Sequence, residues 1–171
     1  LFTDPRIKIL AFPENMGVWD AQNQMAFRAN GDFYVPLGAD DTIEPNYIEK
    51  CLAKFAENPW LEVVVSQTDF IKEDGSPFNT PDNPMMRIPK ITAMSREEML
   101  LRMYGGNAYC GIGMYRTRVI SDLGGWEKKY KVIGDYQMYL KLLQREPMGV
   151  IEENLTHARV DGSNMSLLGP K

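Results

Sequence analysis

The chain has few of the residues that build disulfides and zinc sites. Its 171 residues include two cysteines, Cys51 and Cys110, and a single histidine, His157. The cysteines lack CxxC spacing and have no histidine near them in the sequence, so neither a disulfide framework nor a zinc site is indicated. We therefore expect both thiols to be reduced and packed inside a cytoplasmic protein, and His157 to have a structural or solvent-facing role.

Long apolar runs and an excess of positive charge are also absent. No run approaches the roughly 18 apolar residues of a membrane span, and the net charge is −4 with scattered lysines and arginines. This charge gives no long-range attraction for nucleic acid, so no nucleic-acid partner is expected. With 44% hydrophobic and 25% charged residues, the composition is ordinary for a globular protein, and residues 1–171 are predicted to form one domain.

Strand and helix patterns alternate along the chain, which predicts an α/β layered domain. Strands are expected at 6–12, 32–36, 61–65, 68–72 and 114–116, and helices at 15–29, 45–57, 95–104, 117–123 and 133–143. A proline-rich loop is expected over 77–90, and residues 154–171 are expected to form a tail. Long loops in compact domains are often functional, so residues 77–90 are interpreted either as a lid that faces substrate or as a surface excursion.

The predicted strand at 32–36 leads to two adjacent acids, Asp40 and Asp41. Unpaired carboxylates at the end of a buried strand are costly, so a cation is expected to neutralise them. Mg²⁺ commonly takes one or two protein carboxylates and fills its other positions with water and phosphate oxygens. Two interpretations stay open: a divalent-metal site, or acids that cap the helix predicted to begin near Pro45.

Asp135 is predicted to stand at the N-terminus of the last helix, where free backbone N–H groups stabilise an acid. One interpretation is a simple helix cap. The other is a catalytic base, because an Asp fixed at that position can accept a proton from a hydroxyl group.

Small residues gather just before the predicted strand at 114–116. The glycines are Gly105, Gly106, Gly111 and Gly113, and their spacing does not match phosphate-binding or dinucleotide-binding loops. They are interpreted either as tight turns with close packing or as space in which a ligand reaches the backbone. The tryptophans Trp19, Trp60 and Trp126 are expected in the core, with stacking on sugars as the alternative.

Several stretches together resemble glycosyltransferase family 2, in order and spacing as well as in residue type. The first half contributes Asp4-Pro-Arg-Ile-Lys-Ile, Glu14-Asn-Met-Gly17, Ala21-Gln-Asn23, Gly31-Asp-Phe-Tyr-Val and Ala39-Asp-Asp41 followed by Pro45. The second half contributes Gly111-Ile-Gly-Met-Tyr-Arg116, Leu123-Gly-Gly-Trp126, Gly134-Asp135, Leu140-Lys-Leu-Leu143 and Arg159-Val-Asp-Gly-Ser-Asn-Met-Ser166. The resemblance covers nearly the whole chain.

The resemblance implies a GT-A-like fold with a mainly parallel sheet flanked by helices. It implies an inverting, metal-dependent enzyme that transfers a sugar from a nucleotide-diphosphate donor to a glycan or other hydroxyl acceptor. By similarity, Asp40 and Asp161 would hold Mg²⁺ or Mn²⁺, and Asp135 would be the catalytic base. Asp41 would support the metal or contact the donor sugar. Donor contacts are also implied for Asn15 and Gly17, and acceptor contacts for Gly111, Gly113, Trp126 and Gly134. The implied location is the cytoplasm, at the inner face of the membrane if a parent chain associates peripherally with it.

The chain also departs from the family pattern. Gly38 stands where members commonly carry an acid two residues before the metal-binding Asp, and Gly134 stands where an acid often precedes the catalytic Asp. Asp161 stands where the family often has a histidine, although Asp is also a suitable ligand for a hard cation. The first βαβ unit of the family does not precede Leu1, so we expect a piece of a longer chain that lacks half of the donor site.

Two competing classes remain. A non-catalytic carbohydrate-binding or assembly module would keep the scaffold after losing donor chemistry, which the glycines at positions 38 and 134 favour and the retained acids do not. A nucleotidyl enzyme would share a similar sheet, but it usually needs a glycine-rich phosphate loop near its start, and no such loop is visible in the sequence.

Overall fold

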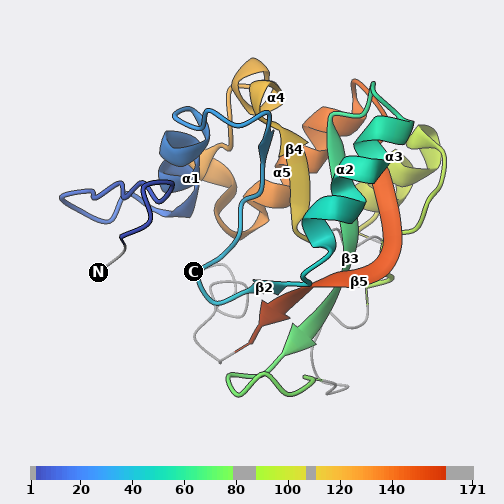
Figure 1. Cartoon of the computed structure of the whole chain (residues 1–171). Coiled ribbons are helices and arrows are strands. Elements are labelled where there is room, and N and C mark those ends of the chain that lie inside the picture. Colours follow the sequence, from blue (N-terminus) through green and yellow to red (C-terminus); the bar gives the residue numbers. More distant parts are fainter. Residues whose placement is uncertain (1–2, 79–87, 107–110, 161–171) are drawn as a thin grey trace.

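The computed structural model describes residues 3–78, 88–106 and 111–160 and shows a five-stranded sheet between helices (Figure 1). The strands are β1 (Phe33–Tyr34), β2 (Thr42–Ile43), β3 (Val63–Ile71), β4 (Gly113–Arg116) and β5 (Gly149–Arg159). The helices are α1 (Val18–Ala26), α2 (Tyr47–Glu57), α3 (Arg96–Tyr104), α4 (Thr117–Asp122) and α5 (Gly134–Leu143), with a 3₁₀ segment at Lys128–Ile133. The α/β class predicted from the sequence is confirmed.

The sheet is mixed, which corrects the expectation of a mainly parallel sheet. Its order is β1-β4-β3-β5-β2, and among the pairs of described strands only β3 and β5 run parallel. Parallel neighbours need a long crossover, and the chain between β3 and β5 contains α3, β4, α4, the 3₁₀ segment and α5. The edge strands β1 and β2 have two residues each, precede and follow the acidic turn in the sequence, and pair antiparallel with β4 and β5.

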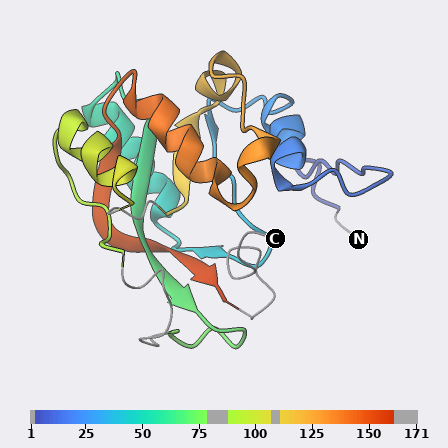
Figure 2. The ribbon, with the colours of Figure 1, turned by 180° about the vertical axis from the view of Figure 1, so that it is seen from behind.

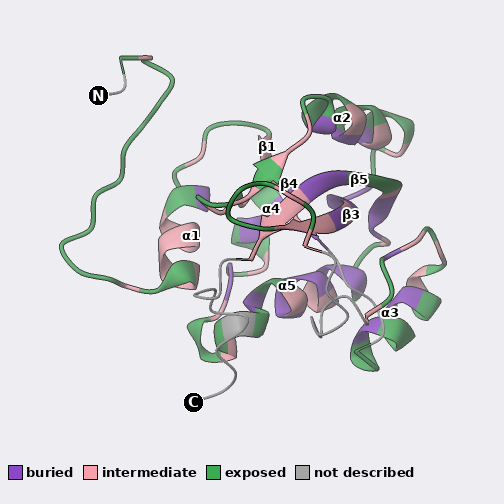
Figure 3. Ribbon diagram, turned by 90° about the horizontal axis from the view of Figure 1, so that it is seen from below, coloured by how far each residue is buried: buried purple, intermediate pink, exposed green. Residues whose placement is uncertain are grey.

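Helices cover both faces of the sheet. Figure 3 shows α2 on one side and α3 with α5 on the other, and Figure 2 shows the α3 and α5 side directly. Alternate residues of β3 explain the two layers, because Val63 and Val65 belong to the cluster beneath α3 and α5 while Val64 packs under α2. Each fully buried valine is worth roughly 1.5–3 kcal/mol of transfer free energy. The site residues are therefore carried by a packed three-layer core.

Cys51 confirms part of the expectation about thiols. It lies fully buried on the inner face of α2, and burial raises the pKa of its thiol to about 11. The thiol is therefore protonated at neutral pH and contributes to packing. Cys110 lies outside the described residues.

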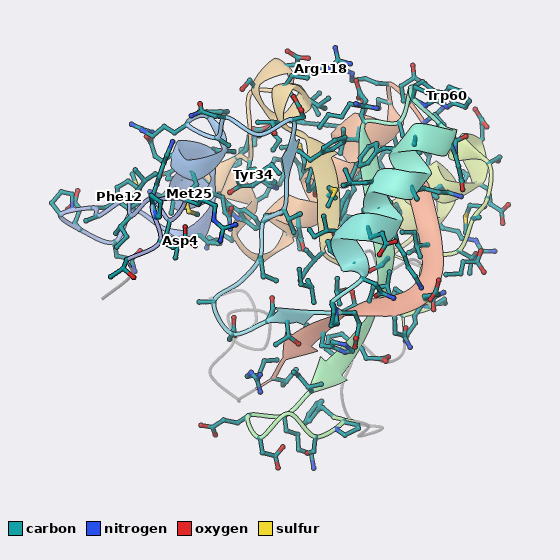
Figure 4. The ribbon with its side chains drawn as sticks, in the orientation of Figure 1. Asp4, Phe12, Met25, Tyr34, Trp60 and Arg118 are labelled. Atoms are coloured by element: carbon teal, nitrogen blue, oxygen red, sulfur yellow. The ribbon has the colours of Figure 1, made fainter. Side chains whose placement is uncertain are left out.

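The N-terminal segment corrects another prediction. Residues 6–12 are exposed and form no strand, and Figure 3 shows this segment running away from α1. Ile9 is 73% exposed, and Phe12, labelled on the same segment in Figure 4, is 37% exposed. A strand requires a neighbour for its hydrogen bonds, and no strand of the described residues lies beside this segment.

Other element boundaries differ in detail. The expected helix at 15–29 begins only at Val18, because Gly17 has φ +85° and its N–H bonds the Asn15 side chain in a turn. The expected strands at 61–65 and 68–72 form the single strand β3, whose register against β5 shifts on both sides of Gln67. The capping box at α3 is confirmed in one half, since the Ser95 side chain accepts a hydrogen bond from Glu98 N–H at 3.2 Å.

The expected tail begins as part of the sheet. Residues 154–159 complete β5, while 161–171 lie outside the described residues, as do 79–87 of the proline-rich loop. Within the part of the chain that the structure describes, no helix combines the length and apolar character needed to cross a membrane.

Candidate active site

The acidic turn lies between β1 and β2, at the edge of the sheet. Asp40 is exposed, Asp41 is half-buried, and the Asp41 N–H donates to Gly38 O at 3.3 Å. The helix-cap interpretation of these acids is wrong, because β2 separates them from α2 and the cap position of α2 is Asn46. The two acids therefore do not cap α2.

Both carboxylates converge on Gly38. A Cβ atom built at this glycine would lie 2.7 Å from Asp41 Oδ2 and 3.0 Å from Asp40 Oδ1. In this arrangement the carboxylates of the two following acids fill the space that a Cβ at position 38 would need, so a side chain there requires these carboxylates to shift. The turn therefore brings one oxygen of each carboxylate to the same side of Gly38.

The electrostatics of Asp41 favour a bound cation. Burial raises the pKa of its carboxyl, and the neighbouring charge of Asp40 raises it further, while a 3.0 Å hydrogen bond from the Arg159 backbone N–H and the positive charge of Arg159 lower it. Burial disfavours the charged form of this carboxyl, and Asp40 adds repulsion between two negative charges; a divalent cation would relieve both costs.

The donor set fits Mg²⁺ or Mn²⁺ bound with few protein ligands. Carboxylate oxygens are the preferred ligands of hard cations, and two of them leave positions for water and a diphosphate. No group of three or more His, Cys, Asp or Glu residues gathers within the described ranges, and Asp161, the other expected ligand, lies outside them. Asp40 and Asp41 are thus the expected site acids that the described chain brings together, and they could hold a metal.

Asp135 lies in the first turn of α5. The cap position is Ile133, so Asp135 is not the capping residue; its Oδ1 accepts a 2.7 Å hydrogen bond from Tyr136 N–H. The packing around it desolvates the carboxyl and raises its pKa, against the hydrogen bonds of the Tyr136 and Asp135 N–H groups. The residue keeps an exposed surface, and solvent screening limits this shift. An exposed carboxylate with a raised pKa is suited to accept a proton.

Gly134 is fixed by Trp19. A Cβ at this position would lie 2.4 Å from Trp19 Cε2, and the indole N–H donates to Lys131 O. Lys131 has φ +45° and ψ −116°, unusual for a residue with a side chain, at the kink just before α5. The glycine before Asp135 therefore lets α1 pack closely against the beginning of α5.

Trp126 confirms the core interpretation for one of the tryptophans. It is 3% exposed, and its ring lies 6.3 Å from that of Trp19, nearly parallel to it. Asn23 bonds the Trp126 backbone twice, through Nδ2 to the carbonyl at 2.8 Å and through Oδ1 from the N–H at 2.9 Å. Trp60 is 58% exposed at the far end of α2 (Figure 4), so the core interpretation is wrong for it.

Gly111 and Gly113 are buried among side chains. A Cβ at Gly111 would lie 1.6 Å from Thr68 Oγ1, and one at Gly113 would lie 2.9 Å from the Tyr139 hydroxyl oxygen. Tyr139 also donates to Gly111 O at 2.6 Å, so close packing of α5 on the sheet accounts for both glycines. An acceptor contact at these positions, as at Trp126 and Gly134, stays a prediction.

Asn15 and Gly17 form the turn that precedes α1, where the Asn15 Oδ1 accepts a 2.9 Å hydrogen bond from Gly17 N–H. Both are placed by local turn chemistry, because the positive φ of Gly17 is accessible at little cost only to glycine. Their donor contacts stay predictions.

Two residues contact the candidate site residues but had no role assigned from the sequence. Arg159 joins the acidic turn through its backbone N–H, and Asn23 clamps Trp126. Asn23 had a usable signal, since it lies among the apolar residues of α1. Arg159 had only its place in the family-like tail.

The site thus combines paired carboxylates in the turn before β2 with an acid in the first turn of α5, on a mixed α/β sheet. Comparison with known proteins identifies the family. The model of the family Glycosyl transferase family 2 matches residues 2–124, more than half of the chain, and the chain belongs to this family.

Curated relatives include polysaccharide synthases. The chain is 28% identical over 143 residues to the chondroitin synthase of Pasteurella multocida (strain Pm70) and, to the same extent, to a hyaluronan synthase of Pasteurella multocida, covering 81% of this chain and 13% of each relative. It is 24% identical over 164 residues to the chondroitin synthase of Escherichia coli, covering 95% of this chain and 22% of that protein. The chain thus spans less than a quarter of the length of these relatives.

A solved structure supports the fold. The crystal structure of S. aureus TarS 1–349 matches with a TM-score of 0.59 and 17% identity, over 84% of this chain and 40% of that one. The expected GT-A-like fold is confirmed by this match. At this identity the likeness concerns fold alone.

Proposed function

We propose that this chain forms the metal-binding and base-bearing part of a glycosyltransferase that moves a sugar from a nucleotide-diphosphate donor to a hydroxyl group of a glycan. The observation that carries the proposal is the convergence of Asp40 Oδ1 and Asp41 Oδ2 on Gly38. Family membership supports glycosyl transfer, and the polysaccharide synthases among the relatives support a growing surface glycan as acceptor.

In the proposed reaction, Asp135 accepts the proton of the acceptor hydroxyl as its oxygen attacks the anomeric carbon. The new carbon–oxygen bond forms on the side of the anomeric carbon opposite the diphosphate. The bond to the diphosphate breaks, and the diphosphate leaves with the electron pair, so the configuration inverts. Asp40 and Asp41 would hold a Mg²⁺ or Mn²⁺ ion, which would supply stabilisation of negative charge on the leaving diphosphate. General-base catalysis of this kind contributes about 10²–10⁴-fold to a rate.

The proposed setting is the cytoplasm, where we place the nucleotide-sugar donor, with the acceptor presented at the inner face of the membrane. Asn15 and Gly17 are proposed donor contacts, and Asp161 a further metal ligand. A nucleic-acid partner is not proposed, because the chain has a net charge of −4.

The second candidate is a non-catalytic glycan-binding module. The glycines at positions 38 and 134 suggested it from the sequence, but the side chains of Asp41 and Trp19 occupy the space beside these glycines. Their presence is therefore explained by packing and does not by itself indicate lost chemistry.

The test separates donor binding from chemistry in the full-length protein. Calorimetry should show Mn²⁺-dependent binding of a uridine diphosphate sugar, and Asp135→Asn should retain that binding while transfer to a glycan primer slows by about 10²–10⁴-fold. Asp122→Asn, an exposed acid at the end of α4, is the matched control and should transfer at the wild-type rate.

Two results would contradict the proposal. An unchanged transfer rate in Asp135→Asn would remove Asp135 as the base. Glycan binding by a folded wild-type protein that neither binds the donor nor transfers sugar would instead establish the non-catalytic module.

A further inference from the structure

Arg159, the last residue of β5, connects three segments of the chain. Its Nε donates to Asp40 O at 2.8 Å, and its Nη1 donates to both Lys72 O and Glu73 O at 2.7 Å. Its backbone N–H donates to Asp41 Oδ1 at 3.0 Å. The end of β5, the acidic turn and the end of β3 therefore meet at one guanidinium group.

The hairpin that follows β3 is a defined structure to which the acidic turn can be fixed. Lys72 N–H donates to Ser76 O at 2.8 Å, and Ser76 N–H donates to Asp74 Oδ1 at 2.9 Å. Gly75, with φ +83°, supplies the left-handed residue that the turn requires. Figure 1 shows this hairpin and the end of β5 projecting together beyond the helices.

An open cavity lies against the same hairpin. Its volume is about 380 Å³, and its lining includes Lys72, Glu73 and Asp74. The carbonyls of Lys72 and Glu73 that accept from Arg159 thus belong to residues that border the cavity. The Arg159 side chain therefore links the Asp40 peptide oxygen to two carbonyls beside this cavity, while the Arg159 backbone N–H holds the Asp41 carboxylate.

We propose that Arg159 is a positioning residue for the metal site, which rests on the proposed role of Asp40 and Asp41 as its ligands. Two of its donors fix the acidic turn, one through the Asp40 peptide oxygen and one through Asp41 Oδ1. The others tie that turn to residues 72–73, so the carboxylates keep their convergence before a cation arrives. Pre-organised ligands bind a metal more tightly than ligands that must first be ordered.

The geometry of this contact requires arginine. The planar guanidinium reaches Asp40 O through one nitrogen and two hairpin carbonyls through another. An ammonium group is a single point from which all donors radiate, and a lysine side chain cannot hold the same separated carbonyls in one plane. Arg159→Lys therefore keeps the positive charge but is expected to lose the link.

The experiment compares Arg159→Lys and Arg159→Ala with the wild-type full-length protein. Mn²⁺ affinity is measured without donor by electron paramagnetic resonance, and amide hydrogen exchange is followed in residues 38–42 and 72–76. Both variants should bind Mn²⁺ about tenfold or more weakly, and exchange should rise in both segments together. The matched control is Arg102→Lys on α3, whose exposed side chain pairs with Glu98 at 3.0 Å and should change neither readout.

The outcomes separate this inference from the proposed function. Mn²⁺ binding by the wild type with the same affinity in Arg159→Lys would overturn the positioning role and leave the metal site standing. Failure of the folded wild type to bind Mn²⁺ would overturn the metal site and the inference together. Because Arg159→Lys is the milder change, it decides the question even if Arg159→Ala does not fold.

Discussion

The acidic turn and the beginning of α5 carry the two proposed halves of the chemistry, and they are held by different forces. Hydrogen bonds to peptide and carboxylate oxygens hold the turn, mostly from Arg159 at an exposed edge. Aromatic packing holds the beginning of α5, where Trp19 lies against Gly134 and stacks on the buried Trp126. The acidic turn thus depends on the geometry of its hydrogen bonds, and the beginning of α5 depends on how closely its side chains pack.

This difference suggests how each half responds to change. Exposed hydrogen-bonded turns are worth little in global stability, so damage there should appear mainly in ligand affinity. Close-packed aromatic contacts tolerate no added atoms, so damage there should appear in unfolding free energy. Substituting the two unusual glycines, Gly38 and Gly134, tests the contrast directly.

Gly134→Ala should have the largest effect on stability. The residue has ordinary helical angles, φ −67° and ψ −34°, so alanine is acceptable to the backbone and favourable for helix formation. Its Cβ would nevertheless lie 2.4 Å from Trp19 Cε2. We expect a loss of about 1–3 kcal/mol in the free energy of unfolding, measured by urea denaturation.

Trp19→Leu supplies the control for this effect. In the double variant the added methyl group should cost much less than it does beside the indole, and a double-mutant cycle measures the difference. Equal costs in both backgrounds would show that contact with Trp19 is not what excludes a side chain from position 134.

Gly38→Asp, which restores the acid common in the family, should affect metal affinity more than stability. Its Cβ would lie 2.7 Å from Asp41 Oδ2, and its charge would add to two carboxylates already close together. We expect Mn²⁺ binding to weaken by up to about tenfold, measured by calorimetry, because the existing ligands must be displaced.

Gly38→Ala separates volume from charge in this experiment. If crowding alone acts, alanine and aspartate should weaken Mn²⁺ binding equally, whereas attraction between the added carboxylate and the cation would make aspartate the less damaging of the two. Tighter binding by Gly38→Asp would mean that the turn opens to use a third carboxylate, and the steric explanation of Gly38 would then fail.

The sequence predicted the layered fold and the acids better than it predicted their surroundings. Local patterns identify α2, α3 and α5, because apolar spacing and turn residues act within a few positions. Residues 6–12 look like a strand from apolar content, but strand formation depends on a neighbour that local sequence does not specify. β5 was predicted only as part of a tail, although it lies inside the sheet between β3 and β2.

The same limit applies to the candidate site. The acids at positions 40, 41 and 135 are visible as residue types, whereas the contacts that hold them join positions more than 100 apart, as in Arg159 with Asp41 and Trp19 with Lys131. The glycines show the limit most clearly, because Gly134 suggests lost chemistry in the sequence and proves to be a packing position against Trp19.

The smallest expected effect is a pH dependence that belongs to the α5 half. Desolvation raises the pKa of Asp135 in the folded protein, so the proposed base becomes active only as pH rises through that raised value. The acidic limb of kcat should therefore lie above the ordinary titration range of aspartate. Folding stability depends on pH in the opposite direction from kcat and falls as pH rises, because the folded state binds this proton more tightly than the unfolded state.

The stabilising contribution of Asp135 is complete below the unfolded pKa and is lost as pH rises through the folded pKa. Asp135→Asn removes this dependence, so the variant should gain thermal stability relative to the wild type between acidic and neutral pH, measured as Tm across that range. The gain should be modest, because the residue retains an exposed surface. A constant difference in Tm across the range would show that the Asp135 carboxyl is not desolvated, and that packing at the beginning of α5 positions the base without tuning it.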